Sequence, residues 1–408
     1  MELLPAAGSA VVVWVAVRSA WAGFAAWRRH REDEVHRRAQ RHSFNQRLDE
    51  VRARQAPARR AVPAWSGYRK FVVAQVVDEA QDVRSFYLQP QDGRPLPPFL
   101  PGQYLTFQVR LPDEDRARVR CYSLSAAPRP EQYRVSVKKV PGGRVSGYLH
   151  SSVSEGALLD VQAPRGAFHI DPAAADTAPV VLVGGGIGLT PLASMLSALV
   201  SSSRDAWFFY GTRNSRQHPW KEELQTLARQ HANIRMVVCY SDPLSEDVVG
   251  QDYDHAGHMS LELLKKSLPS ARADFFVCGP PTLMSAMTAG LEQWGVPSEQ
   301  VHFEAFGPAT VRRAASPAAG PDEGSVNVTF ARSGKTCAWD PQAESVLGLA
   351  EQAGVAIESG CRAGSCGTCE TPLRSGRVAY ATAPGVRPAP GSCLTCVAVP
   401  DGDLVLDA

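Results

Sequence analysis

The sequence has almost no net charge, because 43 Lys and Arg residues are balanced by 41 Asp and Glu residues among 408, leaving a formal charge of +2. A protein that binds nucleic acid through phosphate contacts usually has more Lys and Arg than Asp and Glu, so we expect no nucleic-acid partner. Disulfide-type spacing is also absent among the cysteines outside the C-terminal motif described below, which favours a reducing compartment. The length predicts two or three domains with ordinary hydrophobic cores.

Long apolar runs are absent except at the N-terminus. Residues 10–27 are apolar apart from Arg18 and Ser19, and residues 28–31 that follow are basic. No basic residue precedes the run, which argues against a cleaved signal peptide. A span over residues 3–27 is long enough to cross a bilayer with its basic flank in the cytoplasm.

Two other interpretations of this segment stay open. The helix could lie in the membrane interface with Arg18 reaching the headgroups, or it could pack on a partner protein. We therefore predict a hydrophobic membrane-associated helix over residues 1–27 and a charged tether over residues 28–64. The protein is expected at the cytoplasmic face of the membrane.

The C-terminal part contains a dense cysteine motif. Cys361, Cys366 and Cys369 are spaced C-x4-C-x2-C, and Cys393 and Cys396 follow after a Pro-rich segment. This is the ligand spacing of a plant-type [2Fe–2S] cluster, which carries one electron at a time. A zinc site or disulfides are the alternatives, but zinc sites prefer two separated pairs of cysteines.

The tail around Cys396 resembles the closing strand of plant-type ferredoxins, in which the matching cysteine ligates the cluster. The resemblance implies that Cys396 is the fourth ligand and Cys393 a bystander. It also implies a β-grasp ferredoxin domain over residues 325–408. Residues 307–324 are rich in Pro, Ala and Gly and are predicted to form a linker.

Residues 65–172 alternate short β-branched and aromatic runs with turn residues, as in 71–77 and 133–140. This pattern predicts an antiparallel β-barrel. A phosphate ligand needs a cation with forked donors, and a flavin ring needs an aromatic face with a polar group near its reacting atom. Such residues lie close together in the segment that begins at Arg120.

The segment Arg120-Cys-Tyr122-Ser123-Leu124 follows a Pro-Gly-Gln-Tyr turn at 101–104, and together they resemble the flavin motif of the ferredoxin–NADP reductase superfamily. The resemblance implies that Arg120 pairs with a flavin phosphate and that Tyr122 lies against the isoalloxazine. Ser123 is expected to hydrogen-bond near flavin N5, and Leu124 is assigned to the flavin with them. Taken alone, Tyr122 would be read as a core residue.

A second segment of the barrel resembles the part of that family that receives the flavin diphosphate. It contains Gly143, Val145 and Ser146 at the expected start of a helix, whose unpaired N–H groups suit an anion. Ser146 alone would be read as a helix cap. The motifs occur in the family's order along the chain.

Residues 173–306 alternate strands and helices, which predicts an α/β domain with an open parallel sheet. The run from Gly184 to Pro191, GGGIGLTP, resembles the family's pyridine-nucleotide diphosphate turn. Gly184, Gly186, Gly188 and Thr190 are assigned to the cosubstrate, with Thr190 also expected to cap the following helix. A glycine-rich turn alone is weak evidence for a nucleotide site.

Two further segments complete the predicted reaction site. Cys278-Gly279-Pro280 resembles the family's C-G-P-P loop, where the cysteine approaches the nicotinamide, and Glu304 and Phe306 resemble its closing E-x-F segment at the flavin edge. The resemblance assigns Cys278, Glu304 and Ser123 to catalysis. Without it, Cys278 would be a small buried hydrophobic residue.

The choice between NADH and NADPH depends on the segment after the second strand of this domain. An acidic residue there would bind the ribose hydroxyls of NADH, and none is present. Arg213 or Arg216 could hold a 2′-phosphate, or Arg213 could stack on adenine. Both cosubstrates stay open, with a slight preference for NADH from the domain order.

The order flavin, nucleotide, iron–sulfur resembles phthalate dioxygenase reductase and the hybrid-cluster-protein reductase, and the 140s segment resembles flavohaemoglobin reductase modules. The resemblance implies FAD rather than FMN, and electron transfer from NAD(P)H through flavin and a [2Fe–2S] cluster to an oxygenase, hydroxylase or desaturase. A membrane-tethered redox sensor or scaffold is the alternative, as is a quinone or oxygen reductase acting alone.

Overall fold

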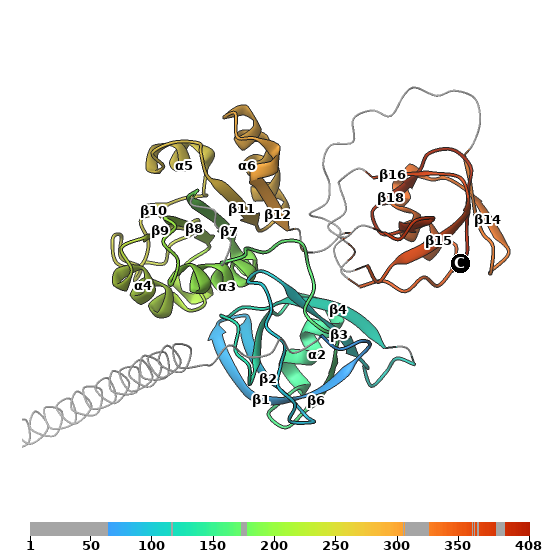
Figure 1. The fold of residues 1–408 in the computed structure, drawn as a ribbon, viewed down its shortest axis with the longest axis horizontal. Coiled ribbons are helices and arrows are strands. Elements are labelled where there is room, and N and C mark those ends of the chain that lie inside the picture. The colour runs from blue at the N-terminus through green and yellow to red at the C-terminus, as the bar shows by residue number, and fades with distance from the viewer. Residues whose placement is uncertain are drawn as a thin grey trace, which may run out of the picture. The chain divides into compact units, whose positions relative to one another are not determined.

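The computed structural model describes residues 64–408 apart from 116, 173–177, 305, 307–325, 361, 363, 365–366 and 381–387. The predicted helix over 1–27, the tether up to residue 63 and the linker over 307–324 therefore lie outside the described residues. Residues Val62–Ala408 form one compact unit, within which three folded parts follow one another along the chain (Figure 1). No helix in the described part is long and apolar enough to cross a membrane.

The first part is a six-stranded antiparallel sheet with the strand order β4-β3-β6-β1-β2-β5. Leu124, just after β4, forms a bridge with Val135 of β5, so the two outer strands meet and the sheet closes into the predicted barrel. The elements are β1 (Arg69–Ala80), β2 (Val83–Pro90), β3 (Tyr104–Val109), β4 (Arg118–Ser123), β5 (Tyr133–Lys138), α2 (Arg144–Ser152) and β6 (Leu158–Val161).

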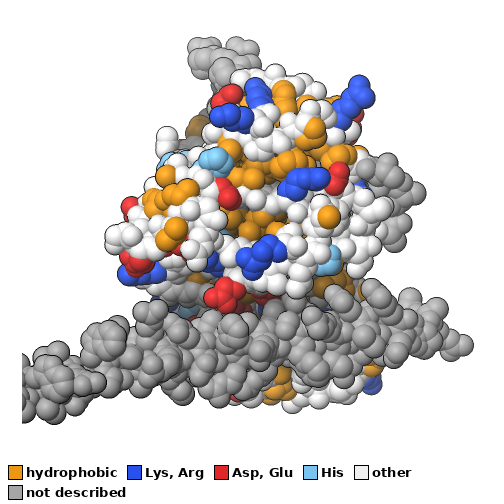
Figure 2. Space-filling model, turned by 90° about the vertical axis from the view of Figure 1, so that its left-hand side faces the viewer, with side chains coloured by type: hydrophobic (Ala, Val, Ile, Leu, Met, Phe, Trp, Pro, Cys, Tyr) orange, Lys and Arg blue, Asp and Glu red, His pale blue; other side chains and the backbone are white. Residues whose placement is uncertain are grey.

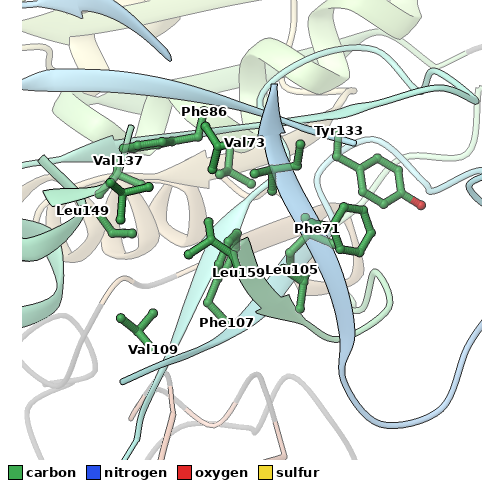
Figure 3. Close-up of a cluster of buried hydrophobic side chains, with 14 of the residues drawn as sticks. Phe71, Val73, Phe86, Leu105, Phe107, Val109, Tyr133, Val137, Leu149 and Leu159 are labelled. Carbon is green, nitrogen blue, oxygen red and sulfur yellow. The ribbon is translucent and has the colours of Figure 1, made fainter. Parts of the chain in front are cut away.

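Alternating apolar residues of these strands fill the barrel. Figure 3 shows side chains such as Phe71, Phe86, Leu105 and Leu149 meeting in its interior, and each is at most 1% exposed. Burying a side chain of this size contributes about 1.5–3 kcal/mol. The packed interior makes β4, which carries the predicted flavin motif, a rigid support.

The second part is a parallel sheet with the order β10-β9-β8-β7-β11-β12. Its strands are β7 (Val180–Gly185), β8 (Ala206–Thr212), β9 (Ile234–Tyr240), β10 (His255–Ala256), β11 (Asp274–Cys278) and β12 (Val301–Glu304). Helices α3 (Leu189–Leu199) and α4 (Lys221–Gln230) share one buried cluster, and α5 (Leu261–Ser267) and α6 (Pro281–Gln293) share another. The strand order reverses next to β7, which is where open α/β sheets bind ligands.

Figure 2 shows one face of the molecule, on which Lys and Arg side chains are interspersed with Asp and Glu side chains.

The third part is a five-stranded mixed sheet, β14-β13-β19-β15-β17, with a two-stranded sheet, β16-β18. Strand β13 pairs parallel with β19, whereas its other neighbour is antiparallel, as expected for a β-grasp arrangement. Ser345 caps α7 by accepting a hydrogen bond from the N–H of Gly348 at 3.1 Å. The elements are β13 (Asn327–Phe330), β14 (Lys335–Ala338), α7 (Val346–Gln352), β15 (Glu370–Ser375), β16 (Val378–Tyr380), β17 (Ser392–Leu394), β18 (Ala398–Pro400) and β19 (Leu404–Leu406).

Candidate functional site

Strand β4 presents the predicted flavin residues in a fixed register. Arg120 pairs with Phe107 of β3, and Tyr122 pairs with Leu105. Because side chains alternate along a strand, Arg120 and Tyr122 lie on one face of the sheet. Tyr122 packs edge-on against Phe107, with the ring centroids 5.3 Å apart.

Arg120 is a cation without a carboxylate partner among the described residues. Its guanidinium donates a hydrogen bond to the carbonyl of Val119 at 2.7 Å, and burial lowers its pKa. Withdrawing a guanidinium from water without a counter-ion is costly. An anionic phosphate would compensate for that cost, so Arg120 fits the predicted flavin phosphate.

Leu124 follows Ser123 but faces another environment. Its side chain is fully buried in the barrel core, and its N–H donates to the carbonyl of Gln103 at 2.9 Å. The structure therefore gives Leu124 a role in closing the barrel. Its predicted contact with the flavin stays a prediction.

Residues 143–146 form the start of helix α2, with Gly143 at the N-cap position and no side-chain cap. Val145 lies in the barrel core, and the Ser146 hydroxyl donates to the carbonyl of Gly143 at 3.3 Å and accepts from the N–H of Val140 at 3.2 Å. These side chains are thus occupied within the protein. The uncapped N–H groups of the first turn are the groups that suit a diphosphate.

The glycines of the turn after β7 have two roles. Some allow close packing of neighbouring segments, and one leaves the backbone open to a ligand. A side chain on Gly188 would begin 2.2 Å from the carbonyl oxygen of Cys278, so Gly188 allows two segments to cross. A Cβ added at Gly184 would lie 3.0 Å from Cδ1 of Leu192, so this glycine also allows close packing. Gly186 has a φ of +52°, and a Cβ added there would meet nothing within 4 Å, so a ligand can approach the backbone at this glycine.

Thr190 does not cap helix α3, in contrast to the prediction. The N-cap residue is Gly188, and the Thr190 hydroxyl donates to the carbonyl of Ile187 at 2.9 Å. Thr190 lies one residue inside the helix, so its oxygen faces the preceding turn rather than the unpaired N–H groups. It holds the glycine-rich turn in shape.

Three residues predicted for catalysis come together although they are distant in sequence. Gly184, Cys278 and Glu304 are neighbours in the parallel register of β7, β11 and β12, at the carboxyl ends of these strands. Ser123 of the barrel donates to Glu304 Oε2 at 3.5 Å. The resemblance alone placed these residues at one site, and the sheet order gives the physical reason.

The ionisation of this group is set by burial. Glu304 is 6% exposed, and removal from water raises the pKa of its carboxyl to about 8. Burial also raises the pKa of the Cys278 thiol well above its ordinary value, with the Glu304 charge as a smaller cause. At neutral pH both groups are therefore protonated, and the site carries no negative charge from them.

The loop after Cys278 leads directly into helix α6. Gly279 lies against the glycine-rich turn, where an added Cβ would be 3.0 Å from the N atom of Gly185, and Pro280 occupies the N-cap position of α6. Phe306, two residues after Glu304, is 38% exposed. An exposed aromatic ring beside Glu304 is suited to cover a planar ligand.

Cys369 and Cys396 lie side by side, with their sulfur atoms 3.1 Å apart. Cys369 precedes β15 and Cys396 follows β17, so two segments converge there. Cys393 is fully buried in the core of the domain, and burial raises its pKa to about 12. The thiolate is the metal-ligating form, so this arrangement suits Cys396 as a ligand better than Cys393. Cys361 and Cys366 lie outside the described residues.

The sequence interpretation missed a buried cation, Arg134 of β5, which is 7% exposed. Its guanidinium lies 4.6 Å from the ring centroid of Trp220 and 3.7 Å from the carboxylate of Glu223, and it also hydrogen-bonds Ser125. In sequence, Arg134 falls on the polar face of an alternating strand and would be taken as solvent-exposed. That face is covered by residues of the nucleotide-type domain.

Comparisons with known families match all three parts of the chain. Residues 70–170 match the oxidoreductase FAD-binding domain, residues 182–289 the oxidoreductase NAD-binding domain, and residues 328–401 the 2Fe-2S iron-sulfur cluster binding domain. The chain is 40% identical over 253 residues to a flavohemoprotein of Bacillus cereus, covering 60% of this chain and 62% of that protein. FAD, NAD(P)H and a [2Fe–2S] cluster are thus the cofactors of the matched domains.

Solved structures extend the match. The FAD/NAD-binding domain of nitric oxide dioxygenase from Vibrio cholerae is 32% identical with a TM-score of 0.53, covering 59% of this chain and all of that one. Phthalate dioxygenase reductase is 27% identical with a TM-score of 0.54, covering 84% of this chain and 98% of that one. A type IV self-sufficient cytochrome P450 monooxygenase is 26% identical with a TM-score of 0.60, covering 86% of this chain and 43% of that one. The chain belongs to the ferredoxin–NADP reductase family of flavin-dependent oxidoreductases and carries a C-terminal [2Fe–2S] domain.

Proposed function

We propose that the protein is an NAD(P)H-dependent reductase that passes electrons through FAD and a [2Fe–2S] cluster to a terminal oxygenase, hydroxylase or desaturase. The observation that carries the proposal is the meeting of Ser123, Cys278 and Glu304 beside the glycine-rich turn. These groups come from the barrel and from two neighbouring strands of the parallel sheet. Such a junction is suited to hold a nicotinamide against a flavin.

The residues of the site act by positioning and by excluding water. Arg120 and the start of α2 would hold the flavin phosphates, and the Tyr122 ring would support the isoalloxazine. When bound, the flavin supplies two-electron acceptance from the nicotinamide and one-electron release, and the cluster supplies single-electron transfer. Hydride transfer needs near contact of the two rings, so the protein contributes geometry rather than acid–base chemistry.

Glu304 adds an electrostatic contribution to that geometry. Because burial raises its pKa to about 8, its carboxyl is neutral at pH 7. A neutral carboxyl can donate a hydrogen bond and does not repel electron density that arrives at a neighbouring ring. A carboxylate at the same place would oppose the gain of negative charge.

The iron–sulfur domain supports a protein acceptor. A cluster that carries single electrons is needed when a partner accepts one electron at a time, and it would be superfluous for a quinone or oxygen reductase acting alone. The similarity to phthalate dioxygenase reductase, described as modular for electron transfer from pyridine nucleotides to [2Fe–2S], agrees with this role. A redox sensor or scaffold with slow turnover is the competing function.

Steady-state reduction of two acceptors separates these functions. A reductase should reduce ferricyanide and cytochrome c continuously at the expense of NAD(P)H, and the variant Cys396→Ser should retain the first activity and lose the second. Flavin reduction that stops after a single turnover in the presence of excess cytochrome c would instead favour the sensor.

We propose further that residues 3–27 attach the reductase to the cytoplasmic face of a membrane. The support is the apolar run followed by the basic residues 28–31. Full-length protein should sediment with membranes and resist a high-salt wash, because salt screens charge contacts and not apolar insertion. A variant lacking residues 1–63 should stay in the supernatant and keep ferricyanide reduction. Release of the full-length protein by salt would refute membrane insertion.

A further inference from the structure

The loops after β8 and β9 lie next to each other at the carboxyl edge of the parallel sheet. The pairing continues past both strands, because Ser241 donates its N–H to the carbonyl of Thr212 at 3.0 Å and Asp242 donates its N–H to that of Arg213 at 2.9 Å. Segments that are about thirty residues apart in sequence therefore form one rim. The loop after β8 contains no acidic residue, but the loop after β9 that lies beside it does.

This rim adjoins the glycine-rich turn. Gly185 of β7 pairs with Gly211 of β8, two residues before Arg213, and the Tyr210 hydroxyl donates to the carbonyl of Gly186 at 3.2 Å. A dinucleotide whose diphosphate lies at this turn places its adenosine ribose toward the loop after the next strand. The rim is accordingly the place where a ribose or a 2′-phosphate would be recognised.

Two acidic residues of the loop after β9, Glu246 and Asp247, contact the loop after β8. Arg216 pairs with Glu246, with 2.8 Å between Nη2 and Oε1. Asp247 accepts hydrogen bonds from the N–H of Ser215 at 3.4 Å and of Leu244 at 2.9 Å, which fixes the acidic loop in place. Arg213 is exposed and has no ion pair within the described part of the chain.

Asn214 connects the two loops. Its amide donates through Nδ2 to the carbonyl of Asp242 at 3.2 Å, which settles the orientation of the amide group. The side chain is 7% exposed, and its Oδ1 has no hydrogen-bond partner among the described residues. Asn214 therefore holds the loop after β9 against the loop after β8.

We propose that this rim selects NADH over NADPH, and that Glu246 is a specificity-determining residue because it occupies Arg216. The inference rests on the proposed function and names its cosubstrate. The charged residues within 213–216 and 242–247 sum to −1, from two arginines and three acids, whereas residues 213–216 alone sum to +2. They are Arg213, Arg216, Asp242, Glu246 and Asp247.

The test compares Glu246→Gln with Asp205→Asn. Asp205 forms an ion pair of the same kind with Arg235, at 3.0 Å and with similar exposure, but at the opposite, amino-terminal edge of the sheet. Neutralising Glu246 removes a charge that repels a 2′-phosphate and releases Arg216 to bind it. Each such exposed charge interaction changes affinity several-fold, so we expect the ratio of kcat/KM for NADPH to that for NADH to rise about tenfold.

Wild-type protein should prefer NADH in ferricyanide reduction, and Asp205→Asn should leave the ratio unchanged. Adding Arg216→Ala to Glu246→Gln should abolish most of the gain. A wild-type preference for NADPH, or an unchanged ratio in Glu246→Gln, would overturn the inference and leave the proposed reductase function intact. Calorimetric dissociation constants for NAD⁺ and NADP⁺ test the same ratio without turnover, so an inactive preparation still decides the matter.

Discussion

The buried carboxyl of Glu304 should make the stability of the folded chain depend on pH. Its pKa is about 8 in the folded chain against an ordinary value of 4.5, and burial is the main cause. Between these two pH values the folded state keeps a proton that the unfolded state has lost. The free energy of unfolding must therefore fall as pH rises through this window, by up to about 1.4 kcal/mol per pH unit.

The size of the effect follows from the same two values. Over the full window the loss reaches about 5 kcal/mol, which is an upper limit because the buried site can relax or admit water. The substitution Glu304→Gln keeps the shape and a hydrogen-bond donor but cannot ionise. Relative to wild type, it should be close to neutral at about pH 5 and stabilising by a few kcal/mol at about pH 8.5.

Thermal unfolding followed by circular dichroism measures this difference. A change of 1 kcal/mol corresponds to about 2–4 °C for a protein part of this size, so the expected gap in Tm at the alkaline end is readily resolved. The matched control is Glu299→Gln, which removes an exposed carboxyl of the same domain. Parallel Tm profiles for wild type and Glu304→Gln across the whole pH range would refute the assignment of a neutral buried carboxyl.

Five other substitutions test further residues of the site and of the barrel. Cys396→Ser should abolish the visible absorbance of the [2Fe–2S] cluster and Cys393→Ser should retain it; the opposite result would exchange their roles. Arg120→Ala should weaken flavin retention by roughly 1.5–3 kcal/mol, seen as a higher flavin dissociation constant, because a charge-assisted phosphate contact is lost. Cys278→Ala should keep flavin and cluster but slow flavin reduction in stopped-flow experiments; an unchanged rate would leave it a packing residue. Arg134→Lys should lower thermal stability by about 1–3 kcal/mol, since lysine lacks the flat fork that stacks and bonds in two directions; an unchanged Tm would mean that this network contributes little.

Much of the fold could be predicted because local patterns match the elements that form. The alternating run that begins at residue 133 became β5, and the alternation of strands and helices over 173–306 became the parallel sheet with its helices. The closing contact of the barrel, between Leu124 and Val135, could not be predicted. It depends on how far the sheet curls, which is a property of all six strands together.

Sequence patterns do not show which segments of the folded chain contact each other. Arg134 lies on a polar strand face that a second domain covers, and the close approach of Gly188 to the carbonyl of Cys278 cannot be seen in the sequence. Thr190 was expected to cap a helix because its residue type does so at helix starts, but the N-cap residue is Gly188, two residues earlier. Glu246 escaped notice because it belongs to the loop after β9 and not to the loop after β8.

The order of strands explains how one sheet can serve both recognition and reaction. Strand β7 lies between β8 and β11, so the glycine-rich turn at its end has the Arg213–Glu246 rim on one side and the Cys278–Glu304 pair on the other. A dinucleotide is long enough to extend from one side to the other when its diphosphate lies at Gly186. The two sides of the turn differ in charge, and each difference suits the half of the cosubstrate that would lie there, the adenosine ribose at the rim and the nicotinamide at the buried pair. The rim keeps ionised groups in water, where they discriminate between a hydroxyl and a phosphate, and the buried end suppresses ionisation, so that no fixed negative charge opposes hydride transfer.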